Sequence, residues 1–348
     1  MVEINEIIEL YIQEGKIVLK KFLSSTLICV AMCLLLTSCG SAEKSKAVNS
    51  KENTQKYNNY VTLSNYMTEW MNSALVTYFN KFGIENEIII KEGFDGFNGV
   101  PILETHKDDL DKALEYASKK PSYGETDVAI KSLHPKMKGL MNTLGEIENY
   151  YKAKSFVDDK FNKGKELHKK VCAQYKEYNT LAEKFFTSFD TISKQKKKED
   201  LDKLKENDMM IRYYAMSILN RAQDIEMSFY KAKVTDDNIL DYDVNKYKEK
   251  YDLLTEDINK FIEYSKDDKR RKKEQIAILP TFSSDIKRVK VAATDIMEIL
   301  KTKNTNINGN IKGRITKGGK TAPLYEFSRI VSNMVDSYNN MINTKVVD

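Results

Sequence analysis

The sequence contains few of the residues that mark β-rich, fibrous or disulfide-bonded proteins. Five Pro and 14 Gly among 348 residues argue against collagen-like chains, low-complexity chains and turn-rich all-β folds. Four Cys are too few for a disulfide scaffold, and a mean hydropathy of −0.53 excludes a protein with many membrane spans. What remains is a lysine-rich chain that is long enough for one large domain or two smaller ones.

Histidine and arginine are also scarce, which limits the chemistry to expect. The three His, at 106, 134 and 168, lack metal-ligand spacing, so we expect no metal and no cofactor. No Gly-x-Ser-x-Gly nucleophile motif is present. Residues 313–321 resemble a phosphate-binding loop, but Arg314 stands where that motif needs its first Gly. Only seven Arg stand against 49 Lys, and the chain carries an export signal, so nucleic acid is not an expected partner.

That export signal lies near the N-terminus. Lys20 and Lys21 precede an apolar segment of about 14 residues, which is shorter than the roughly 20 residues that span a bilayer. It ends in Leu-Thr-Ser-Cys at 36–39, which resembles the lipobox of bacterial lipoproteins. The resemblance implies that residues 1–38 are a cleaved signal peptide and that Cys39 receives diacylglycerol and palmitate-type acyl chains. Two or three such chains would hold the protein at a membrane.

Residues 1–17 do not fit a signal peptide. They carry four Glu and one Lys, a net charge of −3, where signal peptides begin with positive charge. One interpretation is that translation starts at Val18, so that residues 1–17 are not translated. The alternative is a tolerated N-terminal extension.

The segment after the lipidated cysteine differs from the rest of the chain. Residues 40–56 are rich in Ser, Lys, Asn, Ala and Glu without an apolar period, which predicts a flexible tether. The folded domain is then expected over 57–348. After cleavage Cys172 is the one free thiol, so we expect no intramolecular disulfide and interpret Cys172 as a small core residue.

Heptad-like apolar spacing dominates the chain from Tyr57 onward and indicates packed α-helices. Gly83 suits a helix end and Pro323 suits a first helical turn. We therefore predict an all-α fold, an elongated multi-helix bundle of about seven or eight helices. The predicted helices span about residues 57–82, 108–119, 130–151, 158–192, 199–233, 244–264, 282–300 and 324–341.

Three details refine this prediction. Residues 84–105 break the helical pattern, and 87–91 could form a short strand, so the segment is a candidate interaction loop. The lysine-rich stretch 194–198 is predicted to separate two helices and is where two sub-bundles would divide. The apolar spacing puts Trp70 in the core stripe of the first helix, with Asp208 as a polar residue in a later seam.

The sequence also resembles the YiiG-like bacterial lipoproteins, through an overall pattern over about residues 57–345. The resemblance implies an exported, lipid-anchored helical domain of unknown function, and it carries no known catalytic residues. The glycine-bearing stretch 84–105 departs from the family pattern. The likeness is strongest in the segments 57–61 (YNNYV), 150–161 (YYKAKSFVDDKF), 164–168 (GKELH) and 338–340 (YNN).

The stretch 150–168 predicts a helix–turn–helix hairpin. Two Tyr end the first helix, two Asp begin the second, and Gly164 allows a neighbouring helix to approach closely. We interpret it first as a structural hairpin. The alternative is a polar binding site at the turn, formed by Tyr150, Tyr151, Asp158, Asp159 and His168.

Taken alone, the sequence favours a non-enzymatic, lipid-anchored helical protein of the bacterial cell envelope. It would contact the membrane through Cys39, with an envelope protein as a further partner. It would face outward from the plasma membrane, or lie in the outer membrane of a cell with two membranes. One alternative is a lipoprotein that binds a ligand in a Tyr-lined groove, and the other is an envelope hydrolase using His168 with Asp158 and Asp159.

Overall fold

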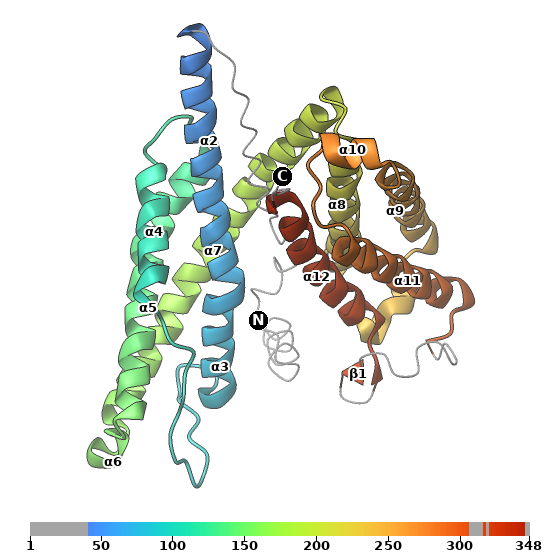
Figure 1. The fold of residues 1–348 in the computed structure, drawn as a ribbon. Helices are drawn as coiled ribbons and strands as arrows, with labels where there is room; N and C mark the ends of the chain where they lie inside the picture. The colour runs from blue at the N-terminus through green and yellow to red at the C-terminus, as the bar shows by residue number, and fades with distance from the viewer. Residues whose placement is uncertain (1–40, 306–315, 318–319, 345–348) are drawn as a thin grey trace. The chain divides into compact units, whose positions relative to one another are not determined.

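The computed structural model describes residues 41–305, 316–317 and 320–344. The fold is all-α, as predicted, and Figure 1 shows the helices in order along the chain. The predicted signal peptide, Cys39 and most of the loop 304–321 lie outside the described residues. No helix in the described part is both long enough and apolar enough to cross a membrane.

The described chain divides into two compact units, residues 41–194 and 195–344. The division falls inside a helix, at the lysine-rich stretch 194–198. The first unit contains α2 (Ser41–Tyr66), the π-helical turn η2 (Met67–Met71), α3 (Asn72–Phe82), α4 (Glu104–Tyr116), α5 (Glu125–Lys152), α6 (Phe156–Asp159) and α7 (Asn162–Glu206) as far as Lys194.

The second unit starts with the end of α7 and is also helical. Its two strands are only two residues long, and they pair antiparallel. It contains α8 (Met210–Lys231), the 3₁₀ helix η3 (Asp236–Asp241), α9 (Val244–Ser265), α10 (Asp268–Lys273), α11 (Pro280–Thr302), β1 (Thr316–Lys317), β2 (Lys320–Thr321) and α12 (Pro323–Asn343).

In the first unit, α2 and α3 form one column that runs antiparallel to α7, as ring contacts at two points along the column show. The rings of Tyr57 and Phe189 are 5.6 Å apart, and further along those of Phe79 and Tyr175 are 5.1 Å apart. Helices α4 and α5 pack beside this column (Figure 1). The apolar stripes read from the sequence therefore meet in one aromatic core.

A buried ion pair joins α2 to the first turn of α5. The side chain of Lys56 is fully buried, and its ammonium group contacts Asp127 Oδ2 at 2.8 Å. The same ammonium donates to the carbonyl oxygens of Lys119 and Pro121, both at 2.9 Å. Asp127 Oδ1 accepts a hydrogen bond from the Tyr60 hydroxyl at 2.5 Å. Each charge is thus paired and hydrogen-bonded, the condition under which ions are tolerated in a core.

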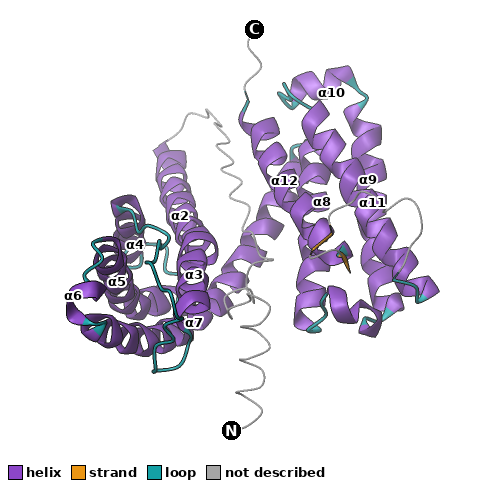
Figure 2. Ribbon diagram, turned by 90° about the horizontal axis from the view of Figure 1, so that it is seen from below, coloured by secondary structure: helices purple, strands orange, loops and turns teal. Residues whose placement is uncertain are grey.

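The second unit is an up-down-up-down bundle of α8, α9, α11 and α12 (Figure 2). Contacts between Phe229 and Tyr247, and between Phe261 and Phe282, show that neighbouring helices run antiparallel. Phe282 also contacts Tyr338, which closes the bundle between α11 and α12.

A carboxylate from outside α8 caps the start of that helix. Both oxygens of the buried Glu274 accept backbone N–H groups, from Ile211 at 3.0 Å and from Arg212 at 2.9 Å. The Arg212 side chain donates back to the Glu274 carbonyl oxygen at 2.9 Å. Burial raises the pKa of Glu274, while the two backbone hydrogen bonds oppose that shift. The contact satisfies N–H groups that a helix start would otherwise leave unpaired.

Two predicted helix boundaries are wrong. Helix α7 continues through 194–198 to Glu206, so the lysine-rich stretch does not interrupt it. The break lies at 207–209, where Asp208 has a positive φ of 52° and belongs to a turn, not to a seam. Arg270 and Lys273 contact its carboxylate at 2.9 and 2.6 Å, and these distant cations stabilise the turn.

Two further expectations differ from the structure. The segment predicted as a flexible tether is helical, since α2 begins at Ser41. Its lack of an apolar stripe does not prevent this, because adding residues to an existing helix is far easier than nucleating one. Residues 87–91 form no strand. Instead, the Ile89 N–H donates to the Phe82 carbonyl oxygen at 2.9 Å and ties the segment to the end of α3.

The ion pair of Lys56 yields a stability prediction. We expect Asp127→Ala to lower the free energy of unfolding by about 3–5 kcal/mol, because the ammonium would stay buried without its counter-charge. Asp111→Ala is the matched control, since Asp111 also pairs with a lysine, Lys138, but is exposed. That control should cost about 1 kcal/mol or less in urea unfolding. Equal losses in the two variants would contradict the prediction.

Candidate functional site

The predicted hairpin at 150–168 exists, and a hydrogen bond closes its turn. The Tyr150 hydroxyl donates to Asp159 Oδ1 at 2.6 Å, and Asp159 Oδ2 accepts the backbone N–H of Lys163 at 2.9 Å. The Tyr150 hydrogen bond and these backbone contacts lower the pKa of Asp159. Asp158 is exposed to solvent. Asp159 therefore links the end of α5 to the start of α7, and Asp158 is not part of that link.

Gly164 lets the two helices of the hairpin approach closely. A Cβ at this position would lie 2.9 Å from the Tyr151 hydroxyl oxygen and 3.1 Å from Tyr150 Cε1. The Tyr151 ring stacks on Phe82 with centroids 4.8 Å apart. Its buried hydroxyl has no hydrogen-bond partner among the described residues. Tyr151 thus serves as aromatic bulk between α3, α5 and α7.

His168 lies fully buried, and both of its ring nitrogens are engaged. Its Nε2 is 2.6 Å from the carbonyl oxygen of Glu85, which can only accept, so Nε2 carries the proton. Its Nδ1 then accepts the Tyr78 hydroxyl at 2.9 Å. Burial lowers the pKa of His168, so the imidazole is neutral. The ring joins α7 to α3 and to the segment that follows α3.

Cys172 lies one turn beyond His168 and shares the same partner. Its Sγ is 3.4 Å from the Glu85 carbonyl oxygen and 3.6 Å from His168 Nε2. Burial raises the pKa of the Cys172 thiol to about 11, so the sulfur stays protonated. A protonated, buried thiol is a poor nucleophile, and the interpretation of Cys172 as a core residue agrees with its burial.

The segment between α3 and α4 covers this end of the unit. Phe97 packs against Phe82 with ring centroids 5.0 Å apart, and Phe94 packs against Phe156 at 5.2 Å. The candidate interaction loop is therefore held by aromatic side chains that point into the core. Of the hairpin candidates, Tyr150, Tyr151 and His168 are buried, Asp159 is half-buried in the turn and Asp158 is exposed, and no cleft is described among them. The contacts of His168 count against the alternative of a hydrolase built on it.

A surface feature that the sequence did not reveal is the π-helical turn η2. Trp70 lies in this turn and is 46% exposed, so its predicted place in the core stripe is wrong. A π turn spans i→i+5, so it holds an extra residue that shifts the helix register, and Met71 takes the buried position instead. The Trp70 ring lies 5.5 Å from that of His106, and the His106 ring contacts Tyr66 at a tilt, with centroids 4.3 Å apart.

Tyrosines do not line a described groove in the way that the ligand-binding alternative expects. The largest fully buried side chains include Tyr60, Tyr78, Tyr178, Tyr247 and Tyr338, all in the helical core. Within the described residues, no group of three or more His, Cys, Asp and Glu is placed to hold a metal ion.

Comparison with known proteins identifies the family. Residues 51–340 match the family described as "Protein of unknown function (DUF3829)", which includes nearly all of both compact units. The chain belongs to the DUF3829 family. A curated protein that resembles it is the "Uncharacterized protein YiiG" of Escherichia coli (strain K12), 26% identical over 87 residues. That match spans 25% of this chain and 25% of YiiG. No solved structure shows a significant match.

The match to DUF3829 agrees with the YiiG-like resemblance seen in the sequence. It begins near the point where the core of the first unit begins, at Lys56 and Tyr57. The family description names no activity, so any function for this chain has to be argued from its own residues.

The close approach at Gly164 gives a second prediction. Gly164→Ala should lower the free energy of unfolding by about 1–3 kcal/mol, because the new methyl group would displace the two tyrosine rings. Gly145→Ala is the matched control, since a Cβ there meets open space inside α5. It should stabilise the protein by about 0.5–1 kcal/mol. Chemical unfolding followed by circular dichroism would separate the two, and effects of the same sign would refute the packing argument.

The buried imidazole gives a third prediction, on pH. Because the pKa of His168 is lowered in the folded state, the unfolded chain binds a proton first as pH falls below about 6.5. Folding stability should then fall by up to about 1.4 kcal/mol per pH unit until the folded-state pKa is reached. The part of this loss due to His168 should disappear in His168→Gln. Unfolding free energies of both proteins between pH 8 and pH 5 give the difference, and parallel curves would show that His168 does not titrate this way.

Proposed function

We propose that this DUF3829 protein is exported, anchored by lipid on Cys39 and active at the cell envelope through binding, not catalysis. The observation that carries the anchor is the lipobox-like sequence at 36–39, which follows two lysines and an apolar segment. All of it precedes residue 51, where the family match begins. A signal that precedes the family match can be removed without changing any matched residue.

The binding role is supported by how the reactive side chains are used. His168 has both ring nitrogens bonded in the core, and Cys172 is a buried, protonated thiol. Asp159 fixes the hairpin turn and Asp127 neutralises Lys56. Each of these groups holds one segment to another, whereas an acid–base catalyst needs access to substrate and freedom to exchange its proton. An envelope protein is the partner class that fits an outward-facing lipoprotein.

The anchor is tested by replacing Cys39. In Cys39→Ala, we expect the chain to lose palmitate labelling and to leave the membrane pellet under conditions that retain the native protein. Cys172→Ala is the matched control. Cys172 is the other cysteine that the cleaved chain would keep, and it is buried in the folded unit. That control should keep both the label and the membrane association.

The outcomes separate the anchor from other causes of membrane retention. Labelled Cys39→Ala protein, or a variant that remains in the pellet after carbonate washing, would refute lipidation at Cys39. Loss of label from both cysteine variants would point to misfolding or failed export, and protease resistance of the folded domain distinguishes these.

A further inference from the structure

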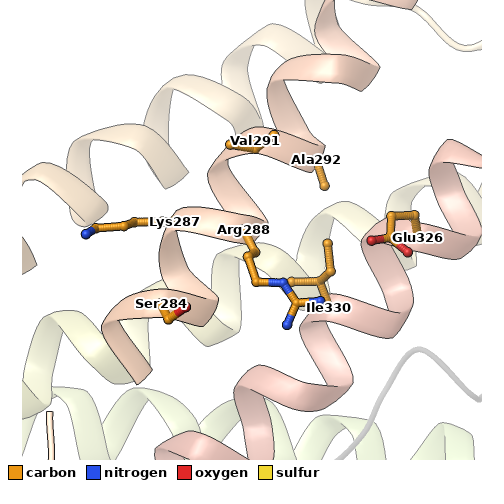
Figure 3. Close-up of a pocket in the computed structure, with 7 residues that line it drawn as sticks. All are labelled: Ser284, Lys287, Arg288, Val291, Ala292, Glu326 and Ile330. Carbon is orange, nitrogen blue, oxygen red and sulfur yellow. The ribbon is translucent and has the colours of Figure 1, made fainter. Parts of the chain in front are cut away.

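A cavity of about 300 Å³ lies between α11 and α12 in the second unit (Figure 3). All of its lining residues belong to the second unit. Its volume equals that of roughly ten water molecules, at the lower end of the range for small-molecule sites. The cavity therefore has room for a ligand of about ten non-hydrogen atoms.

One wall of the cavity is apolar. Ala292 and Ile330 are buried side chains of facing helices, and Val291 is 44% exposed at the edge. Covering an exposed valine beside two buried apolar residues with a hydrocarbon group removes apolar surface from water, which favours binding. This wall favours an aliphatic group over a sugar or another polar body.

The other wall carries positive charge. Figure 3 shows Arg288 reaching from α11 toward Ile330 on α12, with Lys287 directed away from it. Among the described residues, the guanidinium of Arg288 makes one hydrogen bond, to Asp285 Oδ1 at 3.2 Å. A guanidinium has five N–H donors, so most of them remain available to a ligand.

The acidic residue at the cavity is already neutralised. Both oxygens of Glu326 accept from Arg329, at 3.0 and 2.8 Å. With Asp285 paired to Arg288, the three cations Lys287, Arg288 and Arg329 outnumber the two carboxylates. The available charge of the site is therefore positive, and the group it best complements is a carboxylate that can pair with the guanidinium fork.

We propose that this cavity binds a small aliphatic carboxylate, with its head group on Arg288 and its hydrocarbon chain against Val291, Ala292 and Ile330. Octanoate has both parts and about the right number of atoms. The site goes beyond the proposed envelope function, because it needs neither the lipid anchor nor a protein partner.

The experiment is calorimetric titration of octanoate into the full-length protein in lipid nanodiscs, with the heat of empty nanodiscs subtracted. We expect a dissociation constant on the order of 1 mM. Acetate supplies the head group alone and octanol the chain alone, and each should bind at least about tenfold more weakly than octanoate.

Three substitutions and one control assign the binding to this cavity. Arg288→Gln and Val291→Asp should each weaken octanoate binding about tenfold, through loss of the head-group contact and of the apolar wall. Lys301→Gln changes charge by the same amount as Arg288→Gln on the exposed face of α11, and it should leave binding unchanged. Arg288→Lys keeps the charge and should bind octanoate better than Arg288→Gln. That difference would show that the weaker binding of Arg288→Gln does not come from a general folding defect.

Several results would overturn the proposal. Octanoate heat that matches empty nanodiscs would rule out the site. If Arg288→Gln and Lys301→Gln weakened octanoate binding equally, the effect would come from the net charge of the protein and not from a contact with Arg288. Acetate that binds as tightly as octanoate would show an ionic contact without a role for the apolar wall.

Discussion

The hydrogen bond between His168 and the carbonyl oxygen of Glu85 is the contact on which one end of the first unit depends. The segment after α3 contains several glycines and forms no strand, so few backbone hydrogen bonds hold it in place. The imidazole fixes its first residues, and Phe94 and Phe97 then fill the aromatic cluster beneath it. A neutral ring suits this position, because it can donate to a carbonyl and accept from Tyr78 without burying a charge.

Carboxylates perform a comparable task elsewhere in the chain. Asp159 and Glu274 accept backbone N–H groups at the starts of α7 and α8, and Asp127 accepts one from Tyr123 while it neutralises Lys56. In each case an acidic side chain joins elements that are adjacent in space and accepts a hydrogen bond from a backbone N–H group. These polar residues of both units thus position turns and helix ends.

Apolar spacing predicted the fold class and most helices because burial against a neighbour dominates helix stability. It failed where a distant partner decides the local structure. The turn at Asp208 depends on Arg270 and Lys273, more than 60 residues away, and no local pattern signals it. Trp70 was misplaced because a π turn changes the register without any mark in the apolar period. The hairpin was predictable from its own residues, but the use of His168 was not, since Tyr78 and Glu85 lie in remote segments.

Helix α2 begins at Ser41, two residues after the cysteine proposed to carry lipid, and the side chain of Lys56 in this helix is fully buried. Those fifteen steps along a helix correspond to about 22 Å. A flexible chain of the same length would let the folded unit sweep across a range of heights, including contact with lipid headgroups. A helix instead acts as a spacer of set length between the proposed lipid attachment and the core, so lengthening or shortening it by whole turns would change the height of the folded unit above a lipid surface.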